Sequence, residues 1–139
     1  TVIFDESCAI GTSATVGTTL GITGATTMTG GLAGTLIHTG TGITSTSGPG
    51  AVAVTGGVHE ITTTGAGDAM TLANGTAGQR LAVVYVAEGG GADTAVITPT
   101  TLAGGSTITL NALGDSCDLI YSATGGWYVL GLGGTAAVA

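Results

Sequence analysis

The sequence predicts an all-β protein, in which a Gly/Thr-rich N-terminal arm or lobe of short strands precedes a small antiparallel β-sandwich or barrel. Three observations predict this fold class. The 139 residues include 28 glycines, and threonine is about as frequent. Apolar residues come in short alternating runs bounded by glycine, which is typical of strands. No stretch has the i, i+3, i+4, i+7 apolar spacing of an amphipathic helix without interruption by Gly or β-branched residues.

The first region, residues 1–50, contains "GTTLGITGATTMTGGLAGTLIHTGTGITS". Glycine recurs there every few residues between short apolar segments flanked by threonine, without a fixed period. Such segments cannot form a self-sufficient sheet. We expect them either to stack as short strands, to wind around a symmetry axis with neighbouring chains, or to form an extended arm that orders on assembly. Pro49 stands between two glycines and predicts a turn or linker at the boundary with residues 51–139.

The second region contains a series of strand candidates joined by turn-like residues. In chain order they are "VHEITTT" (58–64), "AMTL", "LAVVYVA" (81–87), "TAVIT", "STITL" (106–110), "CDLIYS" (117–122) and "WYVLG". Asn74-Gly75 predicts a tight hairpin, and "ATGG" is expected to join the last two strands. Because "LAVVYVA" is apolar on both faces, it is expected to be a central strand or to lie at a subunit interface.

The composition predicts association between subunits. Hydrophobic residues make up 43% of the chain but aromatic residues only 4%, so the core relies on Ala and Val. Small side chains bury little apolar area each, at about 25 cal/mol per Å², and glycine adds backbone entropy that folding must overcome. We therefore expect copies of the chain to bury surface against one another.

The charge excludes several partners. Eight acids stand against one base, Arg80, which gives a net charge of -7. Nucleic-acid binding needs Lys and Arg to displace counterions, and anionic membranes would repel this surface, so neither partner is expected. No run approaches eighteen strongly apolar residues. The opening "TVIFDESCAI" has no basic start typical of a signal peptide, which predicts synthesis in a cytoplasm.

From about Val58 to Leu132 the chain resembles a β-module that recurs near the C-termini of tailed-phage virion proteins. The likeness is carried by "LANGTAGQ" (L-x-N-G-x-x-G-Q), a strand, "GGG", "GGSTITL", "GDS" and "GGWYV", which are turn and strand motifs. The resemblance implies a homotrimeric capsid decoration (cement) protein that binds the major capsid protein on the outside of the virion head. The alternative is a fibre or spike component that binds host glycans. A third hypothesis is an extracellular filament or adhesive subunit.

The search for catalytic residues predicts no enzyme. Ser116 lies beside carboxylates in "GDSCD" but lacks the G-x-S-x-G elbow and a following helix. His38 or His59 could serve Ser116 or Cys117 only if the fold brought them together. A glycosidase would need two acids in a groove with exposed aromatics. The aromatics Trp127, Tyr128 and Tyr85 are instead predicted to lie in the core.

No metal or other cofactor is expected. The candidate zinc ligands match no known ligand spacing; they are Cys8, His38, His59 and Cys117. Two acidic pairs could donate oxygens to calcium but form no EF-hand loop; they are Asp5 with Glu6 and Asp115 with Asp118. The two cysteines are too few for a disulfide framework, and buried or free thiols are favoured over a bridge.

Arg80 is predicted to form a structural ion pair. Its expected partner is Glu88, Asp93 or an acid of a neighbouring subunit. An exposed side chain and a ligand clamp are the alternatives. The chain contains no lysine, so Lys–Asn isopeptide crosslinks between copies are excluded. Assembly would then depend on packing, β-pairing and backbone hydrogen bonds.

Overall fold

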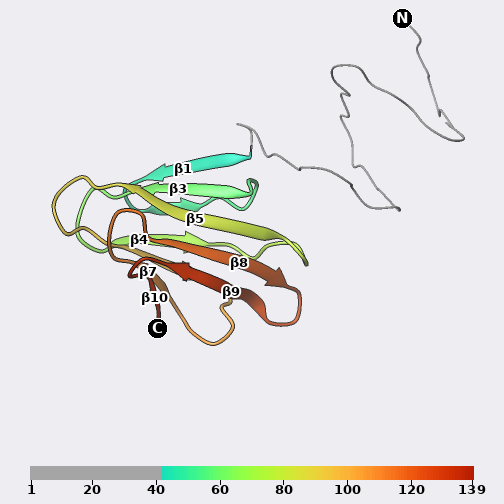
Figure 1. Ribbon diagram of the computed structural model, residues 1–139. Coiled ribbons are helices and arrows are strands. Elements are labelled where there is room, and N and C mark those ends of the chain that lie inside the picture. The colour runs from blue at the N-terminus through green and yellow to red at the C-terminus, as the bar shows by residue number, and fades with distance from the viewer. Residues whose placement is uncertain (1–41) are drawn as a thin grey trace, which may run out of the picture. The chain divides into compact units, whose positions relative to one another are not determined.

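The computed structural model describes residues 42–139, which form two five-stranded β-sheets and contain no helix. The strands of the first sheet follow the order β1-β3-β5-β8-β9, and those of the second sheet follow β10-β7-β6-β4-β2. Figure 1 shows the strands of the first sheet side by side in one layer. The predicted all-β fold class is thus confirmed. Within residues 42–139 there is no helix that could cross a membrane.

Seven of the ten strands in residues 42–139, β3 to β9, match the segments predicted from the sequence to within about two residues, and β1, β2 and β10 were not predicted as separate strands. The strands are β1 (Ile43–Ser47), β2 (Gly50–Val52), β3 (Val58–Thr62), β4 (Asp68–Leu72), β5 (Arg80–Ala87), β6 (Ala95–Pro99), β7 (Ile108–Leu110), β8 (Ser116–Ser122), β9 (Gly126–Gly133) and β10 (Ala137–Val138). Of the N-terminal region, β1 pairs with β3, and residues 1–41 lie outside the described part of the chain. Pro49 lies in the predicted turn, between β1 and β2.

The first six strands wind alternately through the two sheets. β1, β3 and β5 are parallel neighbours in the first sheet, and β2, β4 and β6 are parallel neighbours in the second. The prediction of an antiparallel fold is therefore wrong for this half. The physical reason lies in the connections. Two parallel strands cannot be joined by a tight turn, and here the chain runs back through a strand of the opposite sheet before it forms the next parallel strand.

The hairpin predicted at Asn74-Gly75 is not formed. The strands on either side, β4 and β5, belong to different sheets, so these residues lie in a crossing connection. Gly75 does not have a positive φ, which a type I′ turn would need. A Cβ at Gly75 would lie 2.9 Å from the Trp127 ring, so this glycine serves close packing.

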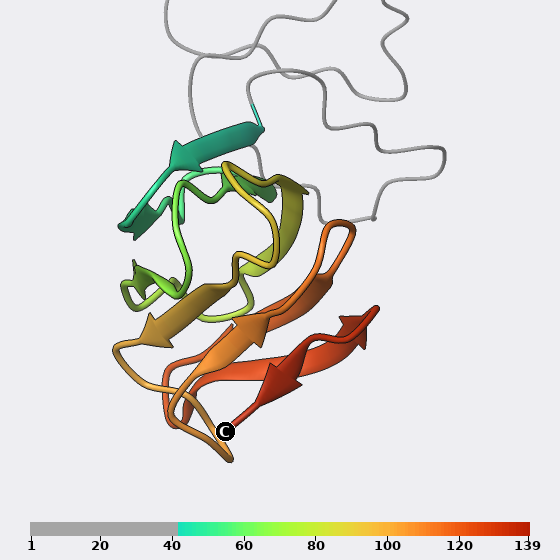
Figure 2. The ribbon, with the colours of Figure 1, turned by 90° about the vertical axis from the view of Figure 1, so that its left-hand side faces the viewer.

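The remaining strands are antiparallel, as predicted. β8 pairs with β5 and β9, and β7 pairs with β6 and β10. The predicted "ATGG" turn joins β8 to β9, with Gly126 at a φ of 80°. The last residue, Ala139, exchanges backbone hydrogen bonds with Thr107, which fixes this end of the chain beside β7 (Figure 2).

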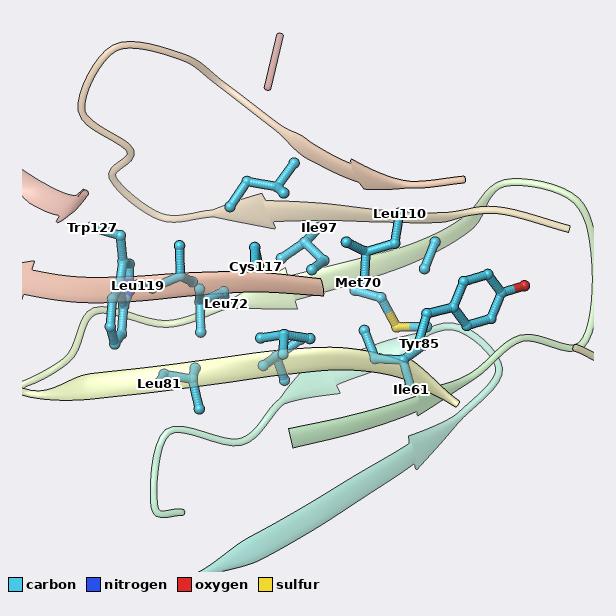
Figure 3. Close-up of a cluster of buried hydrophobic side chains, with 14 residues drawn as sticks. Ile61, Met70, Leu72, Leu81, Tyr85, Ile97, Leu110, Cys117, Leu119 and Trp127 are labelled. Carbon is cyan, nitrogen blue, oxygen red and sulfur yellow. The ribbon is translucent and has the colours of Figure 1, made fainter. Parts of the chain in front are cut away.

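The core lies between the two sheets and consists of inward-facing side chains at alternate strand positions. Its buried apolar members are Val52, Ile61, Met70, Leu72, Leu81, Val83, Tyr85, Ala95, Ile97, Ile108, Leu110, Cys117, Leu119 and Trp127. Figure 3 shows Trp127 at one end of this cluster and Tyr85 at the other. The Trp127 indole donates its Nε1 proton to the Ala73 carbonyl at 2.9 Å, so the largest core side chain is also hydrogen-bonded.

Candidate interaction surface

Three of the side chains that carried catalytic or metal-binding hypotheses are buried in the fold: His59, Asp115 and Cys117. Four others lie outside the described residues: Asp5, Glu6, Cys8 and His38. Asp115 is buried in the turn before β8 and accepts hydrogen bonds from the backbone N–H groups of Asn111 (2.7 Å), Ala112 (3.1 Å) and Thr135 (2.8 Å). The Thr135 hydroxyl adds a fourth, at 2.9 Å. Burial opposes ionisation of this carboxyl, but the four bonds favour the carboxylate and lower its pKa overall. Asp115 therefore ties two loops together.

Within residues 42–139 the geometry does not assemble a nucleophile with a base, and the other candidate base, His38, lies outside them. His59 of β3 pairs in register with Val83 of β5, and Val83 pairs with Cys117 of β8. His59 and Cys117 are thus two strand spacings apart, roughly 10 Å, with Val83 between them. Burial raises the pKa of the Cys117 thiol to about 12, so it stays protonated at neutral pH. Neither Ser116 nor Cys117 is positioned to act as a nucleophile with His59.

His59 is buried with its two ring nitrogens in different states. Nδ1 accepts a hydrogen bond from the Ala53 backbone N–H at 3.3 Å and lies 2.7 Å from the Thr44 hydroxyl. The ring proton is therefore on Nε2, which is buried and has no partner among the described residues. Burial lowers the pKa of His59, only partly offset by the charge of Glu60. The ring is thus a neutral structural group.

A second polar network closes the Tyr85 end of the core. The Tyr85 hydroxyl lies 2.6 Å from the Thr63 hydroxyl and donates to the Asp93 carbonyl at 3.1 Å. The Asp93 carboxylate accepts from the Gly90 backbone N–H, also at 3.1 Å. Asp93 is therefore occupied in a loop. Across residues 42–139 no group of three or more His, Cys, Asp or Glu side chains is arranged to hold a metal ion.

The predicted ion pair of Arg80 with Glu88 or Asp93 is not formed within the chain. Arg80 begins β5, whereas Glu88 follows its last residue, Ala87. Eight extended residues span roughly 26 Å, so the length of the strand separates the charges. Arg80 is exposed and has no ion-pair partner among residues 42–139. Pairing with an acid of a neighbouring subunit stays a prediction.

Of the three aromatic residues predicted to lie in the core, two face the core and one faces outward. Trp127 and Tyr85 are fully buried, as expected for core residues. Tyr128 is 43% exposed, so its assignment to the core is wrong. Adjacent residues of a strand point to opposite faces, and the burial of Trp127 directs Tyr128 outward. Tyr128 pairs in register with Ile120, another outward residue of β8.

The outward side of the first sheet carries larger apolar side chains than a solvated sheet face usually does. This surface, named here the outer face, is taken over β3, β5, β8 and β9 and comprises Val58, Glu60 and Thr62 of β3, Arg80, Ala82, Val84 and Val86 of β5, Ser116, Asp118, Ile120 and Ser122 of β8, and Tyr128 and Leu130 of β9. Val86, Tyr128 and Leu130 are 44%, 43% and 51% exposed. An antiparallel or mixed sheet that faced only water would show polar residues at such positions.

Two hollows flank Arg80 on this surface. One, of about 320 Å³, is lined by Gly57, Arg80, Leu81, Ala82, Asp118, Leu119 and Leu130. The other, of about 500 Å³, is lined by Thr55, Gly56, Gly57, Gln79 and Arg80. Arg80 and Asp118 therefore border the same hollow, with apolar Leu130 and Ala82 beside them. Both hollows are open to solvent and suit protruding side chains better than an enclosed small molecule.

Sequence reasoning identified part of this surface. The two apolar sides of "LAVVYVA" predicted a central or interface strand, and β5 is the central strand of the first sheet. The grouping of Arg80 with Asp118 and Leu130 was missed, because these residues come from three strands. The pairing of β5 with β8 and the bulge in the β8–β9 register bring them together. No signal in the sequence alone specifies that bulge.

A scan against protein-family models finds no match for the chain, and a search of curated proteins finds no related sequence.

Proposed function

We propose that this chain is a virion structural protein, a homotrimeric capsid decoration protein that binds the major capsid protein on the outside of a tailed-phage head. It would act through packing and β-pairing, without catalysis. The proposal starts from the motifs that resemble the phage β-module. Several of those motifs supply residues that hold this sandwich together: Asp115 in "GDS", Trp127 in "GGWYV" and Gln79 at the end of "LANGTAGQ", whose side-chain amide donates to the Val54 carbonyl.

The observation that carries the proposal is the outer face of the first sheet. It presents Val84, Val86 and Leu130 to solvent in a domain whose buried acids and histidine are engaged in internal hydrogen bonds. A surface of this kind favours contact with other protein. Because the same domain offers no assembled catalytic or metal group in residues 42–139, a structural role fits it better than an enzymatic one.

The glycan-binding alternative is less well supported. A fibre or spike that stacks sugars needs exposed aromatics along a groove. Within residues 42–139, Trp127 and Tyr85 are buried and Tyr128 is the one aromatic on the outer face. The filament alternative needs open-ended contacts between copies. These alternatives predict sugar binding and growing polymers, respectively.

The first test is the mass of the purified full chain in solution, measured by light scattering over a wide concentration range. We expect a mass of three chains that does not change with concentration. A monomer, or a ladder that grows into filaments, would contradict the proposed trimer. The second test is co-sedimentation with phage heads assembled without this protein, where saturable binding is expected and no binding would contradict the decoration role.

A further inference from the structure

We propose that copies of this chain meet through the outer face of the first sheet, with Arg80 of one copy paired with Asp118 of its neighbour. This inference rests on the self-association in the proposed function and adds the surface and the charged pair that would form it. Two features of the molecule support it, the contrast between the two sheet faces and the charges on the outer face, and the size of that surface sets how strong a single contact can be.

The second sheet provides an internal reference for what a solvated face looks like in this protein. Its outward residues are small or hydroxylated: Ala51 of β2, Ala69 and Thr71 of β4, Val96 and Thr98 of β6, and Thr109 of β7. This side carries no charged residue at those positions and one branched aliphatic side chain. The outer face of the first sheet has Val58, Val84, Val86, Ile120, Tyr128 and Leu130 at corresponding outward positions. The two sides of the sandwich thus differ in their large apolar side chains: the outer face carries six among its hydroxylated and charged residues, and the second sheet carries one at the positions named above.

The charges on the outer face select a second copy as its occupant. Arg80 is the chain's sole Lys or Arg, so it is the cation that any carboxylate must use in a contact between two copies. Asp118 borders the same hollow as Arg80 and is exposed. The outer face carries this one cation beside Asp118, with a second acid, Glu60, on β3, so Arg80 of one copy can meet a carboxylate of the next copy. Head-to-tail contacts of this kind, in which the Arg80 side of one copy meets the Asp118 side of the next, can repeat around a closed ring.

The outer face is small for a protein interface, so a stable assembly would need several copies of the same contact. It spans four strands and about six residues of each, roughly 19 Å by 20 Å. The resulting flat footprint of roughly 400 Å² is below the about 800 Å² that each partner buries in a typical stable interface. A single contact would therefore be weak, whereas a closed ring joins several such contacts. The open hollows beside Arg80 offer room for a neighbour's Leu130 or Tyr128.

The deciding experiment uses charge reversal at the two positions and measures self-association by light scattering and sedimentation. Arg80→Asp and Asp118→Arg each place like charges opposite one another between identical copies. For each variant alone, we expect the concentration at which half of the assemblies dissociate to rise roughly tenfold or more above the wild-type value. Mixing the two variants is expected to restore assemblies that contain both, because the carboxylate introduced at position 80 of one variant then meets the guanidinium introduced at position 118 of the other. In a mixed three-membered ring, two of the three contacts would be complementary.

Rescue on mixing separates a contact between copies from an effect within one chain. If Arg80 and Asp118 acted on each other only inside a subunit, each variant would keep its defect in the mixture. Thermal melting of each variant checks that the sandwich still folds. Variants that associate like the wild type, or a mixture without rescue, would overturn the inference.

A matched pair of substitutions tests the apolar part of the surface. Val84 and Val96 are both half-buried, outward-facing valines of a central strand, one in each sheet. Val84→Glu is expected to abolish or strongly weaken self-association, and Val96→Glu to leave it unchanged, although both add one negative charge. Equal effects would contradict the choice of face. If the wild type is monomeric at all concentrations, the proposed trimer itself fails; if it is trimeric and the Val84 variant stays trimeric, only the surface is wrong.

Discussion

Two corners of the sandwich each bury a titratable side chain but differ in how completely its hydrogen bonds are satisfied. At the corner where the β7–β8 and β9–β10 connections meet, the Asp115 carboxylate accepts four hydrogen bonds. At the corner formed by β1, β2 and β3, His59 is bonded at Nδ1 but its Nε2 is buried without a partner in the described residues. A satisfied buried group stabilises its surroundings, whereas an unsatisfied one costs free energy. The antiparallel corner should therefore be the more stable of the two.

The largest effect is expected for Asp115→Ala. This change leaves the backbone N–H groups of Asn111, Ala112 and Thr135 without their carboxylate acceptor. We expect the free energy of unfolding to fall by about 2–4 kcal/mol, measured by urea denaturation. Glu88→Ala, which removes a half-exposed acid just past β5, is the control and should stay within about 0.5 kcal/mol. Equal losses in the two variants would show that Asp115 has no special role.

The comparison is sharpened by one substitution made at both corners. Thr135→Val removes a hydroxyl that donates to the Asp115 carboxylate at 2.9 Å, and Thr44→Val removes one that lies 2.7 Å from His59 Nδ1. A hydrogen bond to a charged group contributes about 1.5–3 kcal/mol, and a neutral one about 1 kcal/mol. Thr135→Val should therefore destabilise the protein more, in parallel urea titrations. The reverse order would contradict the ranking of the corners.

The smallest effect is expected from pH. The pKa of His59 is lowered in the folded state, so the unfolded state binds a proton more readily as the pH falls below the ordinary value of 6.5. Stability should be highest above that pH and decline below it, until the folded state also becomes protonated. His59→Gln should flatten this part of the profile in thermal melts between pH 5 and 8. An unchanged slope would exclude His59 as its source.

Protonation of Asp115 should also lower the stability of the protein as the pH falls, but over a more acidic pH range than for His59. Its folded pKa lies below the ordinary value of 3.8, so the stability it contributes is present above pH 3.8 and is lost as the pH falls through its folded pKa. The two corners thus respond to acid in sequence, first at His59 and then at Asp115. An Asp115→Asn variant should lose only the second response.

The sequence predicted which segments form strands but not how the chain connects them. Alternation of apolar residues is a local property, and it located β3 to β9 and the buried Trp127 and Tyr85. Strand direction depends on contacts between residues far apart, and the local turn preference of Asn74-Gly75 lost to the packing of Gly75 against Trp127. The same limit explains why Arg80 does not pair with Glu88 within the chain. Residues close in sequence, such as Arg80 and Glu88, are far apart once an extended strand separates them.

The alternating path of β1 to β6 gives this architecture a natural unit of growth. Each circuit of the chain adds one parallel strand to both layers at once, as β3 with β4 and β5 with β6 do. Inserting two strands, one for each sheet, would widen both sheets by one parallel strand and leave the antiparallel pairing of β7 to β10 unchanged. Inserting half a circuit would exchange the layers for every later strand. We therefore expect such a fold to tolerate insertions or deletions of strand pairs, one strand in each sheet, better than those of a single strand.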